Sequence, residues 1–359
     1  MKASSVILDA LKDMDNTGTL EAEKKMDLYA GKDIRMTADT HREENGQGHT
    51  TAISKRGAAS VTGKESSLTM TAGKDIHLQA ARISSAGDMT IAGKRQVELG
   101  TAVAEKDNRV TWDRSNDRRD STAMETGSTL TAGRNLTVEN GKEITDLEEH
   151  HRHKEKGLLS SKTTTTYDEV KRTDTTGSIV EGDTLTMTAG KDISLTAAEN
   201  RKTTEGNSRS KGAGITASFG IGGLQNVGIS AGKSKGNMEE EIMTHTGSAV
   251  TAKETLAMES GKDLNITGSK AGGKKVEVKT GNNLSIESLQ DSHTYHSRDK
   301  ESGIHLQRDI TVRPDTGKKK MDDPYFSIGK KTDTTDSTYI SVTKQAGIYA
   351  GKEGYDIQV

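Results

Sequence analysis

Residues 68–78 read LTMTAGKDIHL and residues 185–195 read LTMTAGKDISL, so two distant stretches of this chain differ at a single position. Stacked repeat proteins need the same residues at the same place in every repeat, whereas compact enzymes seldom repeat a string of this length. The recurrence therefore indicates a fold that is built by stacking similar turns of chain.

Both strings follow the pattern Φ-x-Φ-x-x-G-x-x-Φ-x-Φ, in which Φ is an apolar residue. The pattern recurs at 26–36, 256–266 and 276–286, and 136–146 follows it except at the last position. Apolar residues at every second position predict a strand with one buried face. Gly with Asp or Asn between the two apolar pairs is typical of turns. Each unit is therefore predicted to be a strand, a corner and a second strand.

The spacing between copies indicates how the units are assembled. Leu256 and Val276 are 20 residues apart, and Leu68 and Met89 are 21 residues apart. A period of about 20 residues with several short strands per turn predicts an all-β solenoid, a parallel β-helix whose turns stack about 4.8 Å apart. Ten residues are expected to point inward in columns: Leu68, Ile76, Met89, Val97, Leu185, Ile193, Leu256, Leu264, Val276 and Leu284.

The composition agrees with a thin core. Only 30% of the residues are apolar and 3% are aromatic, and the 38 glycines indicate many turns. The 51 Lys and Arg balance 53 Asp and Glu, so the net charge gives no reason to expect nucleic acid or an anionic membrane as a partner. The absence of cysteine excludes disulfides and thiolate metal sites. No apolar run approaches the ~20 residues of a membrane-spanning helix.

Five polar stretches interrupt the repeats, at 38–65, 103–127, 148–178, 199–248 and 289–338. Three segments return through the tripeptide Thr-Gly-Ser, at 126–128, 176–178 and 246–248. A fixed exit and a fixed re-entry predict excursions from one corner of the solenoid, and such insertions gather on one face.

The chain is thereby divided into a shaft and its excursions. We expect a poorly defined N-terminal edge at 1–19, a shaft with four excursions at 20–288, a polar excursion at 289–338 and final shaft strands at 339–359. In ITASFGIGGLQNVGIS (215–230), apolar residues alternate on both sides of Gly-Gly, which predicts a β-hairpin with one apolar face.

The string SAGKS (230–234) resembles the end of a phosphate-binding loop. A complete loop needs a glycine five positions before Gly232, where Val227 stands. The triplet AGK also recurs at 30–32, 72–74, 189–191 and 350–352. A recurring corner string explains this motif better than a nucleotide site.

Histidines are the first candidates for metal ligands. His150, His151 and His153 lie in EEHHRHKEK, but every neighbour is charged and no i, i+4 pair on a helix supports a metal site. We therefore prefer a solvated arm. His293 and His296 carry less weight still.

Acids at the corners are the remaining candidates for chemistry. Asp33, Asp75, Asp192 and Asp263 are too sparse for the dense calcium ladder of nonapeptide repeats. Polysaccharide cleavage would need a pair of carboxylates, and no pair stands out. We assign no catalytic residue, no cofactor-binding residue and no metal ligand to this chain.

Three longer strings carry a family resemblance: ISVTKQAGIYAGKEGYDIQV (340–359), LSIESLQDSHTYHSRD (284–299) and KGLLSSKTTTTYDEV (156–170). The first resembles the region that follows the haemagglutinin repeats of two-partner-secretion exoproteins. The other two strings, together with the corner strings, resemble the repeats of the same exoproteins. These are the filamentous haemagglutinin-like adhesins and the contact-dependent growth inhibition effectors of Gram-negative bacteria. The resemblance implies a right-handed parallel β-helix, exported by an outer-membrane transporter that recognises a separate N-terminal secretion domain.

The resemblance further implies a protein displayed on the cell surface. In inhibition effectors a toxin domain follows the repeats, so any toxin activity would belong to residues outside this segment. The expected function is a non-catalytic filament segment that acts in adhesion to a target-cell receptor or in delivery of a toxin across the target's outer membrane. The alternative is a carbohydrate-binding or carbohydrate-cleaving β-helix protein, which carboxylates or arginines aligned on consecutive turns would favour.

Overall fold

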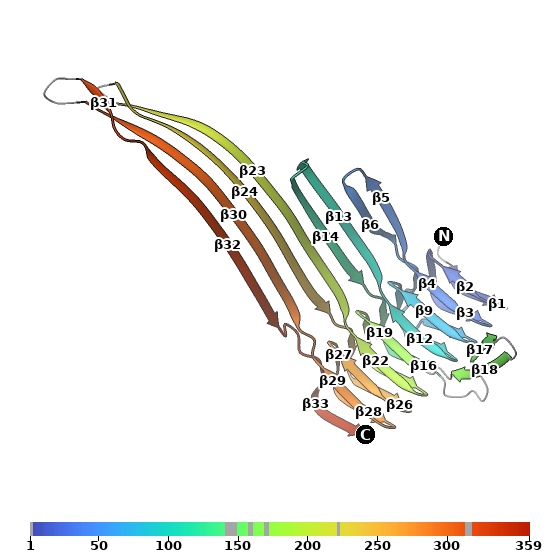
Figure 1. Ribbon diagram of the computed structural model, residues 1–359. Helices are drawn as coiled ribbons and strands as arrows, with labels where there is room; N and C mark the ends of the chain where they lie inside the picture. Colours follow the sequence, from blue (N-terminus) through green and yellow to red (C-terminus); the bar gives the residue numbers. More distant parts are fainter. Residues whose placement is uncertain (1–2, 141–148, 157–160, 169–171, 221–222, 313–317) are drawn as a thin grey trace.

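The computed structural model describes residues 3–140, 149–156, 161–168, 172–220, 223–312 and 318–359. Within these ranges the chain forms strands and no helix, so no helix that could cross a membrane is found there. Figure 1 shows two parts, a shaft of short stacked strands and a fan of long strands that rises from one side of it. The predicted β-helix with long excursions is confirmed.

The shaft has three faces, and all pairing between its successive turns is parallel. Face one contains the first half of β3 (Thr19–Ala30), then β7 (Ala58–Val61), β10 (Arg82–Ser85), β15 (Thr129–Ala132), β20 (Ile179–Gly182), β25 (Ala249–Ala252) and the first half of β28 (Lys270–Thr280). Face two contains β1 (Ala3–Ala10), the second half of β3, β8 (Ser67–Ala72), β11 (Asp88–Gly93), β16 (Asn135–Asn140), β21 (Thr184–Ala189), β26 (Thr255–Ser260) and the second half of β28. β33 (Gly347–Gln358) pairs with both halves of β28.

Face three completes each turn. It contains β2 (Met14–Asn16), β4 (Ile34–Thr37), β9 (Asp75–Gln79), β12 (Gln96–Gly100), β19 (Arg172–Thr176), β22 (Asp192–Thr196), β27 (Leu264–Thr267) and β29 (Leu284–Glu287). The pairing of β1 with β3 and of β2 with β4 adds an ordered turn where the sequence predicted a poorly defined edge.

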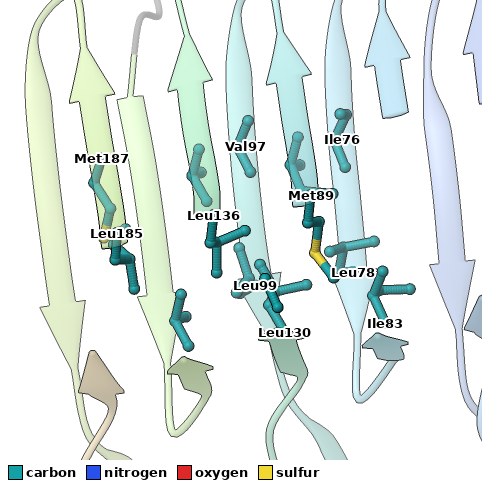
Figure 2. Packing of buried hydrophobic residues seen from close by; sticks show 14 of the residues in the cluster. Ile76, Leu78, Ile83, Met89, Val97, Leu99, Leu130, Leu136, Leu185 and Met187 are labelled. Atoms are coloured by element: carbon teal, nitrogen blue, oxygen red, sulfur yellow. The ribbon is translucent and has the colours of Figure 1, made fainter. Parts of the chain in front are cut away.

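The core consists of columns of apolar side chains inside the shaft. On face two, Leu68, Met89, Leu136, Leu185, Leu256 and Val276 lie in direct register. Figure 2 shows part of this packing. Nine of the ten residues predicted to point inward are at most 1% exposed. Leu284, on the last strand of face three, is only partly buried.

Two contacts explain why the corner string recurs. A Cβ atom on Gly73 would lie 2.1 Å from the Gly31 carbonyl oxygen one turn below, so only glycine fits this close approach. The corner acids accept backbone N–H groups from the next turn: Asp75 N donates to Asp33 Oδ1 (3.3 Å) and Asn283 N donates to Asp263 Oδ1 (3.1 Å). The acids therefore satisfy backbone groups that the strand ladders leave free at the corners.

The fan consists of antiparallel hairpins, which we call arms, joined edge to edge in one arm sheet. Its strands follow the order β5 (Asp39–Asn45), β6 (Gly48–Lys55), β13 (Ala102–Asp113), β14 (Asn116–Thr126), β23 (Ala198–Gly220), β24 (Gly223–Thr246), β30 (Asp291–Val312) and β32 (Tyr325–Ser341), with the short β31 (Lys319–Met321) beside the end of β30. The predicted hairpin at 215–230 lies at the tip of β23 and β24, although Ile221 is outside the described residues.

The arms leave the shaft on every second turn. They follow β4, β12, β22 and β29, while β9, β19 and β27 lead directly into the next turn. A hairpin is two strands wide, about 9.6 Å, and two stacked turns have the same height. Six steps separate β4 from β29 along face three, and six steps separate β5 from β30 across the arm sheet. Because the two periods agree, β6 pairs with β13, β14 with β23 and β24 with β30.

A fifth hairpin leaves at a different corner. Among the described residues, β17 (Glu149–Lys156) and β18 (Ser161–Asp168) pair only with each other, and they lie between β16 on face two and β19 on face three. The expected excursion at 148–178 therefore ends earlier than predicted, since Arg172–Thr176 is a shaft strand that pairs with β12 and β22. The prediction that all excursions share one corner is wrong for this hairpin. The arm sheet has no gap for an arm from this intermediate turn, because β14 of the preceding arm already pairs with β23 of the following arm.

The Thr-Gly-Ser tripeptides build the corner from which the arms leave. Ser128, Ser178 and Ser248 are at most 1% exposed. Ser128 N donates to Ser178 Oγ (3.0 Å) and Ser178 N donates to Ser248 Oγ (3.2 Å), so the hydroxyls form a ladder along the shaft. Gly177 has a φ of 52°, a conformation that favours glycine. The tripeptide thus marks the corner whether or not an arm precedes it.

Candidate functional site

The structure gives the corner acids a structural role. Asp75 is 1% exposed, and Arg95 Nε lies 2.9 Å from Asp75 Oδ1. Asp263 N donates to Asp192 Oδ1 (3.3 Å) in the same way as at other corners. Their carboxylates accept hydrogen bonds from backbone N–H groups and from a guanidinium group, and they do not converge on a common point.

The other sequence candidates also lie in regular strands. Ser230–Ser234, the phosphate-loop-like string, is extended chain within β24. His150, His151 and His153 lie on β17, and their side chains are outside the described residues. His293 pairs with Glu240 across two arms (2.8 Å), and His296 pairs with Asp336. The described part of the chain contains no group of three His, Asp or Glu residues arranged to hold a metal ion.

A polar groove of about 550 Å³ lies where face three meets the base of the arms. His77 Nδ1 is 2.8 Å from Glu98 Oε2, and this hydrogen bond raises the pKa of His77 and lowers the pKa of Glu98. Glu125 accepts a hydrogen bond from Thr101 (3.1 Å). Each of these groups has a partner inside the protein, so the groove presents paired polar groups and not a poised acid and base.

The most distinctive surface is an apolar band near the tips of the longest arms. Two transverse rows of directly opposed residues cross all four strands: Ala213, Ala231, Ile304 and Ile328, then Ile215, Ile229, Leu306 and Phe326. The rows are two residues apart on each strand, so all eight side chains share one face. Together with Ala217 and Val227 they form what we call the apolar band. Ile215 is 81% exposed and Ile328 is 72% exposed.

A basic band adjoins the apolar band on its shaft side. The next two rows on the same face contain Lys211, Lys233 and Lys330, then Arg209, Lys235 and Lys300. An apolar groove of about 450 Å³ on the apolar band is lined by Ile215, Ile229, Ile304, Leu306 and Phe326 among others. Although the overall charge is −2, positive charges are therefore concentrated in the basic band.

The opposite face of the same strands carries small and polar residues. One row consists entirely of Gly212, Gly232, Gly303 and Gly329, and the adjoining row contains Ser210, Ser234, Glu301 and Lys331. The distal arm sheet is therefore amphipathic, with one apolar and basic face and one polar face. The apolar alternation within a single hairpin could be predicted from the sequence. The bands could not, because they arise only from the registers that align four strands of two separate arms.

Comparison with known proteins places these repeats in a family. The family model described as hemagglutinin repeat matches residues 110–303, which is more than half of the chain. This chain belongs to the hemagglutinin repeat family. The predicted resemblance to the haemagglutinin-repeat region of two-partner-secretion exoproteins is confirmed. No solved structure matches the chain.

Curated relatives share part of these hemagglutinin repeats. The tRNA nuclease CdiA of Yersinia mollaretii is 35% identical over 135 residues, which are 37% of this chain and 4% of that protein. The toxin CdiA of Escherichia coli is 37% identical over 130 residues, 36% of this chain and 4% of that protein. The deoxyribonuclease CdiA of Dickeya dadantii is 32% identical over 134 residues, 37% of this chain and 4% of that protein. The matched segment is therefore a small fraction of each relative.

Proposed function

We propose that these hemagglutinin repeats form a non-catalytic filament segment of a large secreted or cell-surface exoprotein that delivers a toxin to neighbouring cells. The relatives support a non-catalytic role, because proteins named as a tRNA nuclease and as a deoxyribonuclease share this segment. A segment common to different named activities does not determine either of them. The shaft and the arms would be separate functional units, one a rigid spacer and the other a contact surface.

The apolar band carries the proposal for contact. Within this proposal, the band enters the outer membrane of the target cell, and the basic band meets the phosphates of its headgroups. Burial of an Ile or Phe side chain stabilises by ~1.5–3 kcal/mol relative to exposure. Lysine side chains next to an apolar surface keep their ammonium groups at the polar boundary, and basic residues beside a buried apolar face are typical of proteins that lie in a membrane interface.

The proposal implies two partners. One is an outer-membrane transporter of the two-partner-secretion type, which would recognise a secretion domain elsewhere in the longer protein. The other is the surface of the target cell, which the arms would meet at their tips. Surface display on the producing cell follows from the same export route.

Vesicle binding tests the contact proposal. Phe326→Ser with Ile328→Ser removes two residues of the apolar band that are 57% and 72% exposed. The matched control is Tyr339→Ser with Ile340→Ser, which lie on the same strand outside the band and are 64% and 55% exposed. Co-sedimentation with phosphatidylethanolamine and phosphatidylglycerol vesicles should weaken more than tenfold for the first variant only.

Two results would refute membrane contact. One is an absence of vesicle binding by the unaltered chain, and the other is an equal loss of binding in both variants. Binding should also weaken with added salt, since the basic band contributes by attraction to anionic headgroups.

A further inference from the structure

We infer that the free edge of β32 is a docking site for one more antiparallel strand, the outgoing strand of a further arm carried by the second shaft turn beyond β29. Such a strand would extend the arm sheet whether or not the apolar band contacts a membrane.

The returning strands of the four arms occupy equivalent positions in the arm sheet. β6, β14, β24 and β32 each run from an arm tip back toward the shaft. Each of the first three pairs on its far side with the outgoing strand of the next arm: β13, β23 or β30. β32 has the same position in its arm, but in the described part of the chain only β30 pairs with it. The vacant edge thus continues an established interface.

The two outer edges of the arm sheet, β5 and β32, differ in length and regularity. β5 is 7 residues long, and its pairing with β6 contains a register shift. Its residues include Asp39, Arg42, Glu43 and Glu44, and charged, short, irregular strands are typical of edges that stay unpaired.

β32 also carries charged residues, Lys330, Lys331, Asp333 and Asp336, but it differs from β5 in length and regularity. It is 17 residues long and pairs with β30 in unbroken register from Tyr325 to Ser341. It contains no proline, and its middle contains Thr332, Thr334 and Thr335, a residue type that favours strands. A long and regular edge of this kind is a template for another strand.

The spacing of the shaft turns also fits a further arm beside β32. β33 adds one turn to the shaft beyond β28. An arm from the turn after that one would leave two turns beyond β29, the same interval that separates each existing pair of arms. That interval equals the width of a hairpin, so the new outgoing strand would meet β32 without bending.

The rows predict the chemistry of the incoming strand. Gly329 ends the row of four glycines, and Phe326 and Ile328 end the two apolar rows. A strand that continues these rows carries a glycine opposite Gly329 and apolar residues opposite Phe326 and Ile328. Opposite Lys331, whose ammonium group already contacts Asp333, an acidic or neutral polar residue fits.

A peptide probe tests the edge in the full chain. The probe is a fluorescent peptide with the sequence of β30 (Asp291–Val312), which already pairs with β32 on the other side in antiparallel register. Two further versions carry N-methyl groups on alternate residues, in the two possible phases. Because N-methylation blocks one edge of a strand, one phase should bind like the parent peptide and the other should bind about tenfold or more weakly.

Amide hydrogen exchange locates the bound peptide. The inference predicts new protection within 325–341 and unchanged protection in β24. An absence of saturable binding, or equal binding of both N-methylated versions, would overturn it. A dimer in light scattering whose β32 amides are already protected would also overturn it, because a second copy would then be the occupant.

Discussion

At the residue scale, each recurring side chain answers a requirement of stacking. The apolar columns exclude water from the shaft, Gly73 permits the close approach of neighbouring turns, and the corner acids satisfy backbone N–H groups. Every turn stacks on neighbours of the same shape, so the same residue types are required at the same positions in each turn. This is why LTMTAGKDI recurs in nearly unaltered form.

The column on face three provides a direct test. Ile76 is 0% exposed and lies in register with Ile34 and Val97. Ile76→Asp places a carboxylate among apolar side chains without a partner, and should lower the free energy of unfolding by several kcal/mol. Thr90→Asp, at an outward-facing position on β11 between Thr69 and Thr137, should change it by roughly 0.5 kcal/mol or less. Chemical denaturation measures both, and equal midpoints for the two variants would be incompatible with an inward-facing Ile76.

At the element scale, arms and shaft meet through a corner that also exists without an arm. Thr267, Gly268 and Ser269 connect β27 directly to β28, and Ser248 N donates to Ser269 Oγ (3.0 Å). The same tripeptide, Thr246–Ser248, stands at the end of the arm formed by β23 and β24. The corner therefore belongs to the shaft, and the arm is an insertion ahead of it.

This comparison predicts the outcome of two deletions. Removal of residues 197–246 joins Thr196 to Gly247 and recreates the corner found at Thr267–Ser269. The shaft should remain folded, with its β circular dichroism and cooperative thermal unfolding retained. Removal of 197–248 also eliminates Ser248, whose hydroxyl accepts from Ser178 N and donates to the Thr196 carbonyl oxygen. That variant should be less stable, because buried backbone groups lose their partners.

Unfolding of the first variant would show that the arm is part of the shaft's own core. Equal stability of the two variants would instead remove the structural role assigned to the serine ladder.

Much of the shaft could be predicted because its information is local and repeated. The strand, corner and strand pattern gave the turns, and the spacing gave the stack. The arm sheet could not be predicted in the same way, since its pairing joins segments such as β6 and β13 that share no recurring string. The end of the excursion that contains β17 and β18 could not be predicted either. The shaft strand Arg172–Thr176 has Thr173 and Thr175 at its inward positions, where other turns carry apolar residues, so it lacks the recurring pattern. Thr173 accepts a hydrogen bond from Asn140 (2.7 Å), which makes a buried hydroxyl acceptable there.

At the scale of the whole molecule, the height of two stacked shaft turns equals the width of one hairpin. Arms on alternate turns therefore join into a continuous sheet. The sheet in turn aligns the β23–β24 arm with the β30–β32 arm, and only this alignment creates the apolar and basic bands. If the bands contact a target cell as proposed, that contact depends on the period of the shaft.

The most direct test of this account is a distance across the arm sheet. Glu44 on β5 and Thr338 on β32 belong to one transverse row that also contains His49, Asp107, Ser121, Thr203, Glu241 and Thr294. The chain has no cysteine, so Glu44→Cys and Thr338→Cys can carry two spin labels without interference. Seven strand steps separate the two sites, and pulsed electron paramagnetic resonance should give one narrow distribution near ~34 Å. A broad distribution, or a mean distance well beyond this value, would show that the arms move independently and would contradict the account.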